Sequence, residues 1–177
     1  QVCAELQKWF TDSLPNTATI AAYWAIKGEI DIQPLMDQWR AQGGQVLLPI
    51  VREKASPLAF APYRGQEMMK AGAYGILEPM YEENELIETS ESISTVIIPC
   101  LGFTENGYRL GYGGGFYDRT LAHWRATLEI LEPLQNPQTK QKSIMQTTIG
   151  VADACACVAL TPDAFDVPLD YLCLFDT

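Results

Sequence analysis

One stretch decides the fold class of this chain: Ser94-Thr-Val-Ile-Ile-Pro-Cys-Leu-Gly-Phe-Thr-Glu-Asn-Gly-Tyr-Arg-Leu-Gly-Tyr-Gly-Gly-Gly-Phe-Tyr-Asp-Arg119. It opens with a β-branched run, Ser94–Ile98, which predicts a buried strand that ends at Pro99. It leads into a helix predicted from Tyr117 to Glu129. A strand, a glycine-rich bend and a helix in this order indicate an α/β fold, whose ligands bind at the carboxyl edge of the sheet.

The bend has the residues of a phosphate site. Glycines at Gly111 and Gly113–Gly115 let the backbone adopt positive φ and approach a ligand closely. Successive N–H groups ahead of a helix N-terminus form an anion cradle, and Arg109 and Arg119 on either side could donate to phosphate oxygens. The bend is neither a Walker loop nor a dinucleotide fingerprint, because it lacks Gly-Lys-Ser/Thr and has Phe116 where the last glycine belongs. A flexible hairpin is the alternative interpretation.

A carboxylate, Asp118, stands in the first turn of the predicted helix. It has two interpretations: it complements the helix dipole, or it holds Mg²⁺ beside a bound polyphosphate. We expect His123, the single histidine, to be a surface or core residue rather than a catalytic base.

The flanking sequence continues the alternation of strands and helices. Asp31 is expected to cap a helix that carries Leu35, Met36 and Trp39 on one face and ends at Gly43-Gly44. The other predicted elements are a helix over 1–13, strands over 18–25, 45–51 and 57–63, a short helix over 66–71, an acidic loop over 78–91, a surface linker over 132–142, and strands over 147–152, 155–160 and 171–175. We therefore expect one domain over residues 1–177, with three layers and a mostly parallel sheet flanked by helices. Because Gln1 is not an initiator, the first helix is expected to be incomplete.

Composition narrows the class of protein. A hydrophobic fraction of 47% over 177 residues supports an apolar core without disulfide or metal cross-links. No apolar run approaches the roughly 18–20 residues of a membrane span. A net charge of −10 repels nucleic acid phosphates and anionic lipids. The five cysteines are unevenly spaced, which favours buried thiols in a reducing compartment over a metal site at Cys155-x-Cys157. We expect a monomeric, cytoplasmic protein with no nucleic acid or membrane partner.

The glycine segment resembles that of the 5-formyltetrahydrofolate cyclo-ligases, also called methenyltetrahydrofolate synthetases. The similarity extends over most of the chain. The segments that carry it are Pro99–Phe103, Gly107, Arg109–Arg119, Tyr23, Glu29–Asp31, Val46–Pro49, Gly75–Pro79 and Asp166–Asp170.

The resemblance implies ATP and Mg²⁺ as co-substrate and cofactor, 5-formyltetrahydrofolate as substrate, and a role for each matched residue. ATP would be bound by Arg109, Leu110, Gly111, Tyr112, Gly113, Gly114, Gly115, Phe116 and Tyr117, of which Arg109 and Tyr117 would be catalytic. The folate would be bound by Trp24, Glu29, Tyr112, Gly113, Gly114, Gly115 and Phe116. Mg²⁺ would be held by Asp118 and Asp166. Three of these residues have simpler interpretations: Trp24 as core, Glu29 as a first-turn carboxylate, and Asp166 as the cap of a turn.

The implied reaction needs few acids or bases. The formyl oxygen on N5 attacks the γ-phosphate of ATP, and N10 then closes the ring as phosphate departs. Two departures from the family pattern stand out: Lys8 is the only cation before Lys27, where the family has a Lys and Arg pair, and Phe165 precedes Asp166 where the family often has His. A binding homologue with reduced activity is the second hypothesis, and a sugar-phosphate or CoA enzyme the third.

Overall fold

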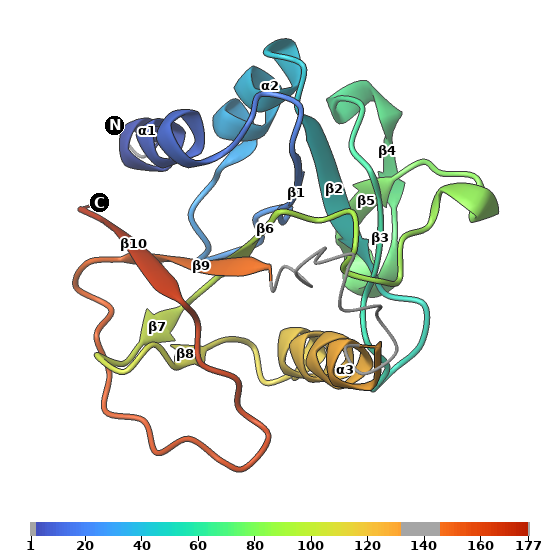
Figure 1. Cartoon of the computed structure of the whole chain (residues 1–177). Coiled ribbons are helices and arrows are strands. Elements are labelled where there is room, and N and C mark those ends of the chain that lie inside the picture. Colours follow the sequence, from blue (N-terminus) through green and yellow to red (C-terminus); the bar gives the residue numbers. More distant parts are fainter. Residues whose placement is uncertain (1–2, 132–145, 177) are drawn as a thin grey trace, which may run out of the picture.

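The computed structural model describes residues 3–131 and 146–176 (Figure 1). Its helices are α1 (Cys3–Ser13), α2 (Gln33–Ala41) and α3 (Phe116–Leu131). Its strands are β1 (Thr19–Ala21), β2 (Gln45–Ile50), β3 (Ala59–Pro62), β4 (Met69–Ala71), β5 (Leu77–Pro79), β6 (Thr95–Pro99), β7 (Gly102–Phe103), β8 (Arg109–Leu110), β9 (Thr147–Asp153) and β10 (Tyr171–Phe175). Single 3₁₀ turns lie at Gln66–Met68, Ala73–Gly75 and Glu83–Glu85.

The main sheet of the described residues has six strands in the order β10-β9-β6-β1-β2-β3. Every neighbouring pair is parallel except β2 and β3, which are antiparallel. Helices α1 and α2 cover one face of the sheet and α3 covers the other (Figure 1). The expected three-layer α/β fold with a mostly parallel sheet is confirmed.

Each face of the sheet has its own apolar core. Successive side chains of a strand point to opposite faces, so Ile20 packs with α1 and α2 while Ala21 packs with α3. Phe10 of α1 and Trp39 of α2 join the first core, and Trp124 of α3 joins the second. Each fully buried large apolar side chain contributes about 1.5–3 kcal/mol relative to an exposed one. The two cores hold the helices that flank the ligand edge of the sheet.

The strand order places a topological switch between β1 and β6. From β1 the chain runs through α2 to β2 on one side, and from β6 it runs through α3 to β9 on the other. Loops that leave neighbouring parallel strands in opposite directions open a crevice at the carboxyl ends of those strands. We therefore expect the loop after β1 and the glycine segment after β6 to form the two walls of such a crevice.

Some predicted elements differ from the structure because their outcome depends on partners distant in the sequence. The strand predicted over 18–25 is limited to Thr19–Ala21, and the segment 155–160 has only an isolated bridge from Cys157 to Phe103. The helix predicted over 66–71 is a single 3₁₀ turn followed by β4, because β4 pairs with β5 to form a hairpin. The acidic loop over 78–91 also begins within β5, and the linker predicted over 132–142 lies outside the described residues.

The expected N-cap of α2 is also wrong. Ile32 occupies the N-cap position, and Asp31 instead accepts the Gln33 N–H at 2.8 Å. An aspartate that accepts the N–H two residues ahead forms a local turn. Asp31 therefore stabilises the turn just before α2 instead of capping the helix itself. The expected buried face of this helix and its end before Gly43 are confirmed.

None of the described helices combines the length and apolar character needed to cross a membrane.

Candidate functional site

The glycine segment forms a short hairpin and then an open turn. Strands β7 and β8 pair in antiparallel fashion, the backbone turns through 111–115, and α3 begins at Phe116. Gly113 and Gly115 have φ of 78° and 62°, which L-residues rarely adopt. Gly107 in the hairpin loop packs so closely on Leu169 that a Cβ would lie 2.8 Å from its carbonyl oxygen. The C-terminal segment therefore supports the hairpin that leads into the turn.

Arg109 and Asp118 form a nearly buried ion pair. Arg109 Nη2 lies 2.7 Å from Asp118 Oδ1, and the two side chains are 7% and 21% exposed. The backbone of Val167 bridges them, since its N–H donates to Asp118 Oδ1 at 3.1 Å and its carbonyl accepts from Arg109 Nη1 at 3.2 Å. These bonds fix the orientation of both charged groups relative to the C-terminal loop.

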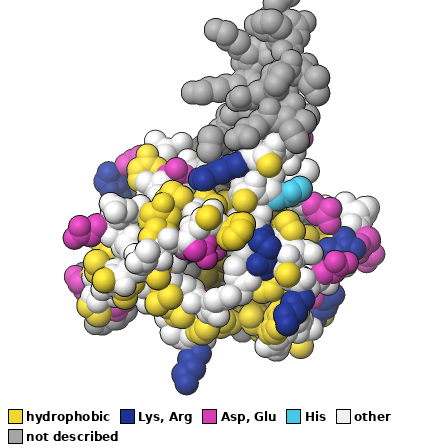
Figure 2. Space-filling model, turned by 90° about the horizontal axis from the view of Figure 1, so that it is seen from below, with side chains coloured by type: hydrophobic (Ala, Val, Ile, Leu, Met, Phe, Trp, Pro, Cys, Tyr) yellow, Lys and Arg dark blue, Asp and Glu magenta, His cyan; other side chains and the backbone are white. Residues whose placement is uncertain are grey.

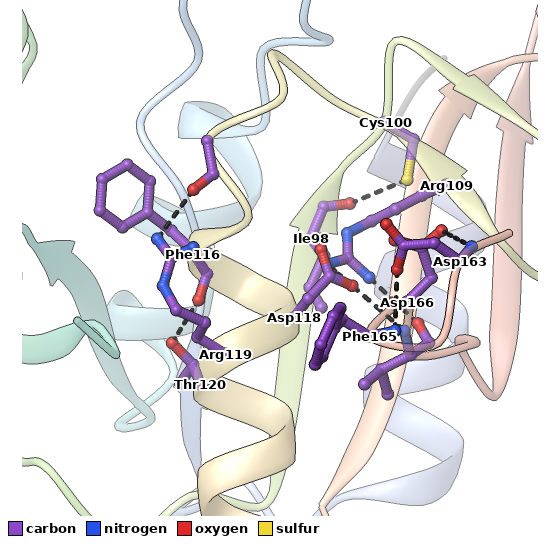
Figure 3. Close-up of polar contacts among 12 residues, drawn as sticks. Ile98, Cys100, Arg109, Phe116, Asp118, Arg119, Thr120, Asp163, Phe165 and Asp166 are labelled. Carbon is purple, nitrogen blue, oxygen red and sulfur yellow. Dashed lines mark hydrogen bonds and ion pairs between the residues drawn. The ribbon is translucent and has the colours of Figure 1, made fainter. Parts of the chain in front are cut away.

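The structure brings the two predicted metal ligands into one neighbourhood. Asp166 directly precedes Val167, whose N–H is bonded to Asp118, and Figure 3 shows both carboxylates on the same side of α3. Asp166 Oδ2 accepts the N–H of Asp163 at 2.9 Å, which shapes the loop. No group of three or more His, Cys, Asp or Glu side chains that could hold a metal occurs among residues 3–131 and 146–176. Two carboxylates still fit Mg²⁺, which usually keeps several waters and binds one or two carboxylates together with substrate phosphates.

Arg119 was expected to donate to phosphate oxygens, but in the structure its guanidinium donates to backbone carbonyls. Its Nη2 donates to the carbonyl of Gly114 at 2.7 Å, and its Nε donates to the carbonyl of Ser56 at 3.5 Å. The guanidinium also lies 5.0 Å from the centre of the Phe116 ring (Figure 3). This arginine thus contacts the protein on three sides.

The loop after β1 carries Glu29 and is closed by local hydrogen bonds. The carboxylate of Glu29 accepts the Ile26 N–H at 3.0 Å, and the Glu29 N–H donates to the Ile26 carbonyl at 2.9 Å. The buried Tyr23 hydroxyl donates to the carbonyl of Ile30 at 2.7 Å. Gly28 of the same loop lies close to the glycine segment, because a Cβ there would lie 3.6 Å from the Tyr112 hydroxyl.

Electrostatic coupling joins the two walls of the crevice. Burial raises the pKa of Glu29, although the bond from Ile26 partly opposes the shift. Burial, followed by the nearby Glu29 carboxylate, raises the pKa of Tyr117 far above its usual value. Burial likewise raises the pKa of the Cys100 thiol to about 11. Tyr117 is therefore a protonated phenol at neutral pH, able to donate a hydrogen bond but not to act as a base.

Trp24 lies on the rim of the first core. It is half-buried and packs against that core, with its ring centre 6.1 Å from that of Tyr63. The simpler interpretation of Trp24 as a packing residue therefore has direct support, and its predicted contact with a substrate stays a prediction.

Sequence reasoning did not find Tyr74 as a neighbour of the site. Tyr74 lies between β4 and β5, is 66% exposed and has φ of 58°. Its ring meets the Phe116 ring edge-on at 6.2 Å, which adds an aromatic group to the glycine turn. A non-glycine residue with positive φ often marks a functional position, but no sequence pattern predicts it.

The face seen from below α3 mixes exposed hydrophobic side chains with basic and acidic ones (Figure 2).

The fold and the site together define an α/β protein whose topological switch point is flanked by a glycine turn, a helix N-terminus and a coupled pair of acidic and phenolic side chains. The model of the 5-formyltetrahydrofolate cyclo-ligase family matches residues 5–174. The chain belongs to this family, which confirms the resemblance read from the glycine segment.

Individual relatives agree with the family assignment. The chain is 34% identical to the 5-formyltetrahydrofolate cyclo-ligase of Escherichia coli (strain K12), over 85% of this chain and 74% of that protein. It is 32% identical to the Haemophilus influenzae protein of the same name, over 85% and 72% of the two chains. The solved structure of Aquifex aeolicus 5,10-methenyltetrahydrofolate synthetase matches with a TM-score of 0.66 and 27% identity, over 96% of this chain and 75% of that one.

A second solved structure supports the fold alone. The 5,10-methenyltetrahydrofolate synthetase of Mycoplasma pneumoniae matches with a TM-score of 0.61 at 24% identity, over 97% of this chain and 80% of that one. Membership of the family makes this chain a ligase of folate metabolism.

Proposed function

We propose that this enzyme converts 5-formyltetrahydrofolate to 5,10-methenyltetrahydrofolate, with ATP and Mg²⁺ required and ADP and phosphate released. One observation carries the proposal. A glycine turn ahead of α3 lies at the β1/β6 switch point, near a loop with a half-buried carboxylate, Glu29. Such a crevice offers an anion site on one wall and a polar, partly apolar site on the other, as a triphosphate and a pterin require.

The nucleotide side of the proposed site is the turn and the start of α3. Backbone N–H groups over 111–117 would bind the phosphates, because the first N–H groups of a helix have no intrahelical partners. Arg109 adds a fixed positive charge beside them, and its ion pair with Asp118 holds it in place. Apolar contact with the nucleotide and exclusion of water would come from Leu110, Tyr112 and Phe116. The side chains of Leu110 and Tyr112 are exposed and so are accessible to a ligand.

The folate side is the loop after β1 together with the aromatic residues of the turn. Glu29, with its raised pKa, can share a proton with a ring nitrogen or amino group of a pterin. Tyr112, Phe116 and Tyr74 offer flat apolar surface to an aromatic ligand. Trp24 would support this wall from behind, through its packing on Tyr63.

The chemistry relies on positioning and on neutralisation of charge. The formyl oxygen attacks the γ-phosphorus and the bond to ADP breaks. N10 then attacks the former formyl carbon, its proton passes to the departing phosphate, and the C–O bond to phosphate breaks. Arg109 and the turn N–H groups would stabilise charge on the transferred phosphoryl group, and the Tyr117 phenol would donate a hydrogen bond to it. Mg²⁺, held by Asp118 and Asp166, would neutralise phosphate charge; Asp118 can use Oδ2, since its ion pair with Arg109 uses Oδ1.

The direct test is to mix the protein with 5-formyltetrahydrofolate, ATP and Mg²⁺ and to follow the ultraviolet absorbance of the methenyl product. Turnover should require all three, and ADP formation should match product formation one to one. Binding of the folate without turnover, measured by calorimetry, would instead favour the second hypothesis of a binding homologue with reduced activity. The expected monomer and cytoplasmic location can be checked by light scattering and by fractionation of the source cells.

A further inference from the structure

The feature that the proposed function leaves unexplained is the environment of Arg119. Its guanidinium joins three elements: it donates to Gly114 in the turn and to Ser56 in the loop after β2, and it covers the face of Phe116 at the start of α3. Among the residues that the structure describes, no carboxylate forms an ion pair with it. A cation is thus held on backbone carbonyls beside the turn of the proposed phosphate site.

The bond to the Gly114 carbonyl sets the direction of the next amide. The carbonyl and the N–H of one trans peptide point in opposite directions. When Arg119 holds the Gly114 carbonyl, the Gly115 N–H is therefore aimed away from the guanidinium. The bond selects one orientation of a peptide that glycines on both sides would otherwise leave free to rotate.

Close packing reinforces this orientation. A Cβ on Gly115 would lie 2.8 Å from Arg119 Nη1, so the guanidinium lies directly against the turn. On its other side the guanidinium lies 5.0 Å from the Phe116 ring centre, and Tyr74 meets that ring edge-on. Arg119 therefore connects the turn to an aromatic wall of the crevice as well as to the loop after β2.

We propose that Arg119 is a positioning residue that holds the glycine turn in the shape that receives phosphate, acting through the Gly114 carbonyl rather than on the phosphate itself. The nucleotide part of this inference rests on the proposed function. The planar fork of arginine suits the role, because it can donate to two carbonyls and lie flat on a ring at once, whereas a lysine ammonium cannot.

The test compares Arg119→Lys and Arg119→Ala with wild type, and uses Arg125→Ala, on the same helix, as a matched control. The first readout is the ¹⁵N backbone order parameters of Gly113–Gly115 in protein without nucleotide. They should fall from the range of rigid backbone toward that of flexible loops in both Arg119 variants and stay unchanged in the control. The second readout is the Kd for ATP and for ADP. Both should rise about tenfold or more in both variants, by a similar factor for each nucleotide.

The outcomes separate two roles for Arg119. If Arg119→Lys keeps wild-type order parameters and wild-type Kd values, the charge acts directly on phosphate and the inference is overturned. A rise in the Kd for ATP with ADP unaffected and the turn still ordered would overturn it as well. If the turn loses order but no protein binds ATP, the positioning role stands and the proposed function fails, so the two failures are distinguishable.

Discussion

The two loops that form the crevice are built in different ways. The loop after β1 is closed by contacts within itself, such as the bonds from Tyr23 to Ile30 and between Ile26 and Glu29. The glycine segment after β6 is held by contacts with distant segments, through Arg109 to Val167 and through Arg119 to Ser56. A carboxylate can thus be positioned by a few neighbouring residues, whereas an open turn with glycine at four of its five positions needs support from outside, because glycine has no side chain to hold the backbone.

The largest effect should follow from breaking the buried ion pair of the glycine segment. Arg109→Ala and Asp118→Ala should each lower kcat/KM by about a thousandfold or more. The first removes the positive charge that stabilises the transferred phosphoryl group, the second removes a proposed ligand of Mg²⁺, and each misplaces the partner side chain. Each should also lower the free energy of unfolding by about 3–5 kcal/mol, since an unpaired charge is left in a site where the side chains are 7% and 21% exposed.

These two effects can be measured by product absorbance and by urea unfolding. Lys8→Ala is the control, because its pair with Asp12 is 79% and 58% exposed and exposed pairs contribute little. Near-normal rates in either Arg109→Ala or Asp118→Ala would contradict the roles assigned to them.

A smaller loss of activity should follow from a substitution that distorts the turn itself. Gly115→Ala should raise the KM for ATP about tenfold, because the residue has φ of 62° and its Cβ would displace Arg119. Gly111→Ala provides the comparison: no atom lies within 4 Å of its Cβ position and its φ is not positive, so we expect only about a twofold change. Equal changes in the two variants would show that the shape of the turn does not determine nucleotide binding.

A substitution in the loop after β1 should have a weaker effect, and only on the KM for the folate. Tyr23→Phe removes the 2.7 Å bond to the Ile30 carbonyl while keeping the ring in the core. We expect the KM for 5-formyltetrahydrofolate to rise about three- to tenfold, as for loss of one neutral hydrogen bond, and the KM for ATP to stay within twofold. Steady-state kinetics with each substrate varied in turn checks this, and a change confined to ATP would contradict it.

The smallest effect concerns the pH dependence of stability. Burial raises the pKa of Glu29 in the fold, so its favourable contribution is complete below the unfolded pKa and is lost as pH rises through the folded pKa. Glu29→Gln removes this loss. The Tm of the variant minus that of wild type should therefore become more positive between about pH 4 and pH 7, by no more than a few degrees. Scanning calorimetry across this range checks the sign; a difference that becomes more negative with pH would be contrary to a raised pKa.

Local patterns in the sequence predicted the elements that flank the site. The β-branched run at Ser94–Ile98 and the helix after the glycine bend are found within one or two residues of their expected bounds. The segment 155–160 was wrongly predicted as a strand, since an apolar run becomes a strand only where a partner edge is available. Asp118 and Asp166 could be proposed from motifs, but their nearness depends on the bond from the Val167 N–H to Asp118, a contact between two motifs that neither motif predicts.

The amino-acid sequence by itself determined the α/β class, the glycine turn and the family, because periodicity, β-branching and glycine content act on the nearest few residues. The tertiary structure alone decided that Arg109 is bound to Asp118, that Arg119 is directed to the Gly114 carbonyl, and that Glu29 lies near enough to Tyr117 to raise its pKa. The Arg109–Asp118 pair joins residues on different elements, and burial strengthens it by removing the water that would otherwise compete for the same charges.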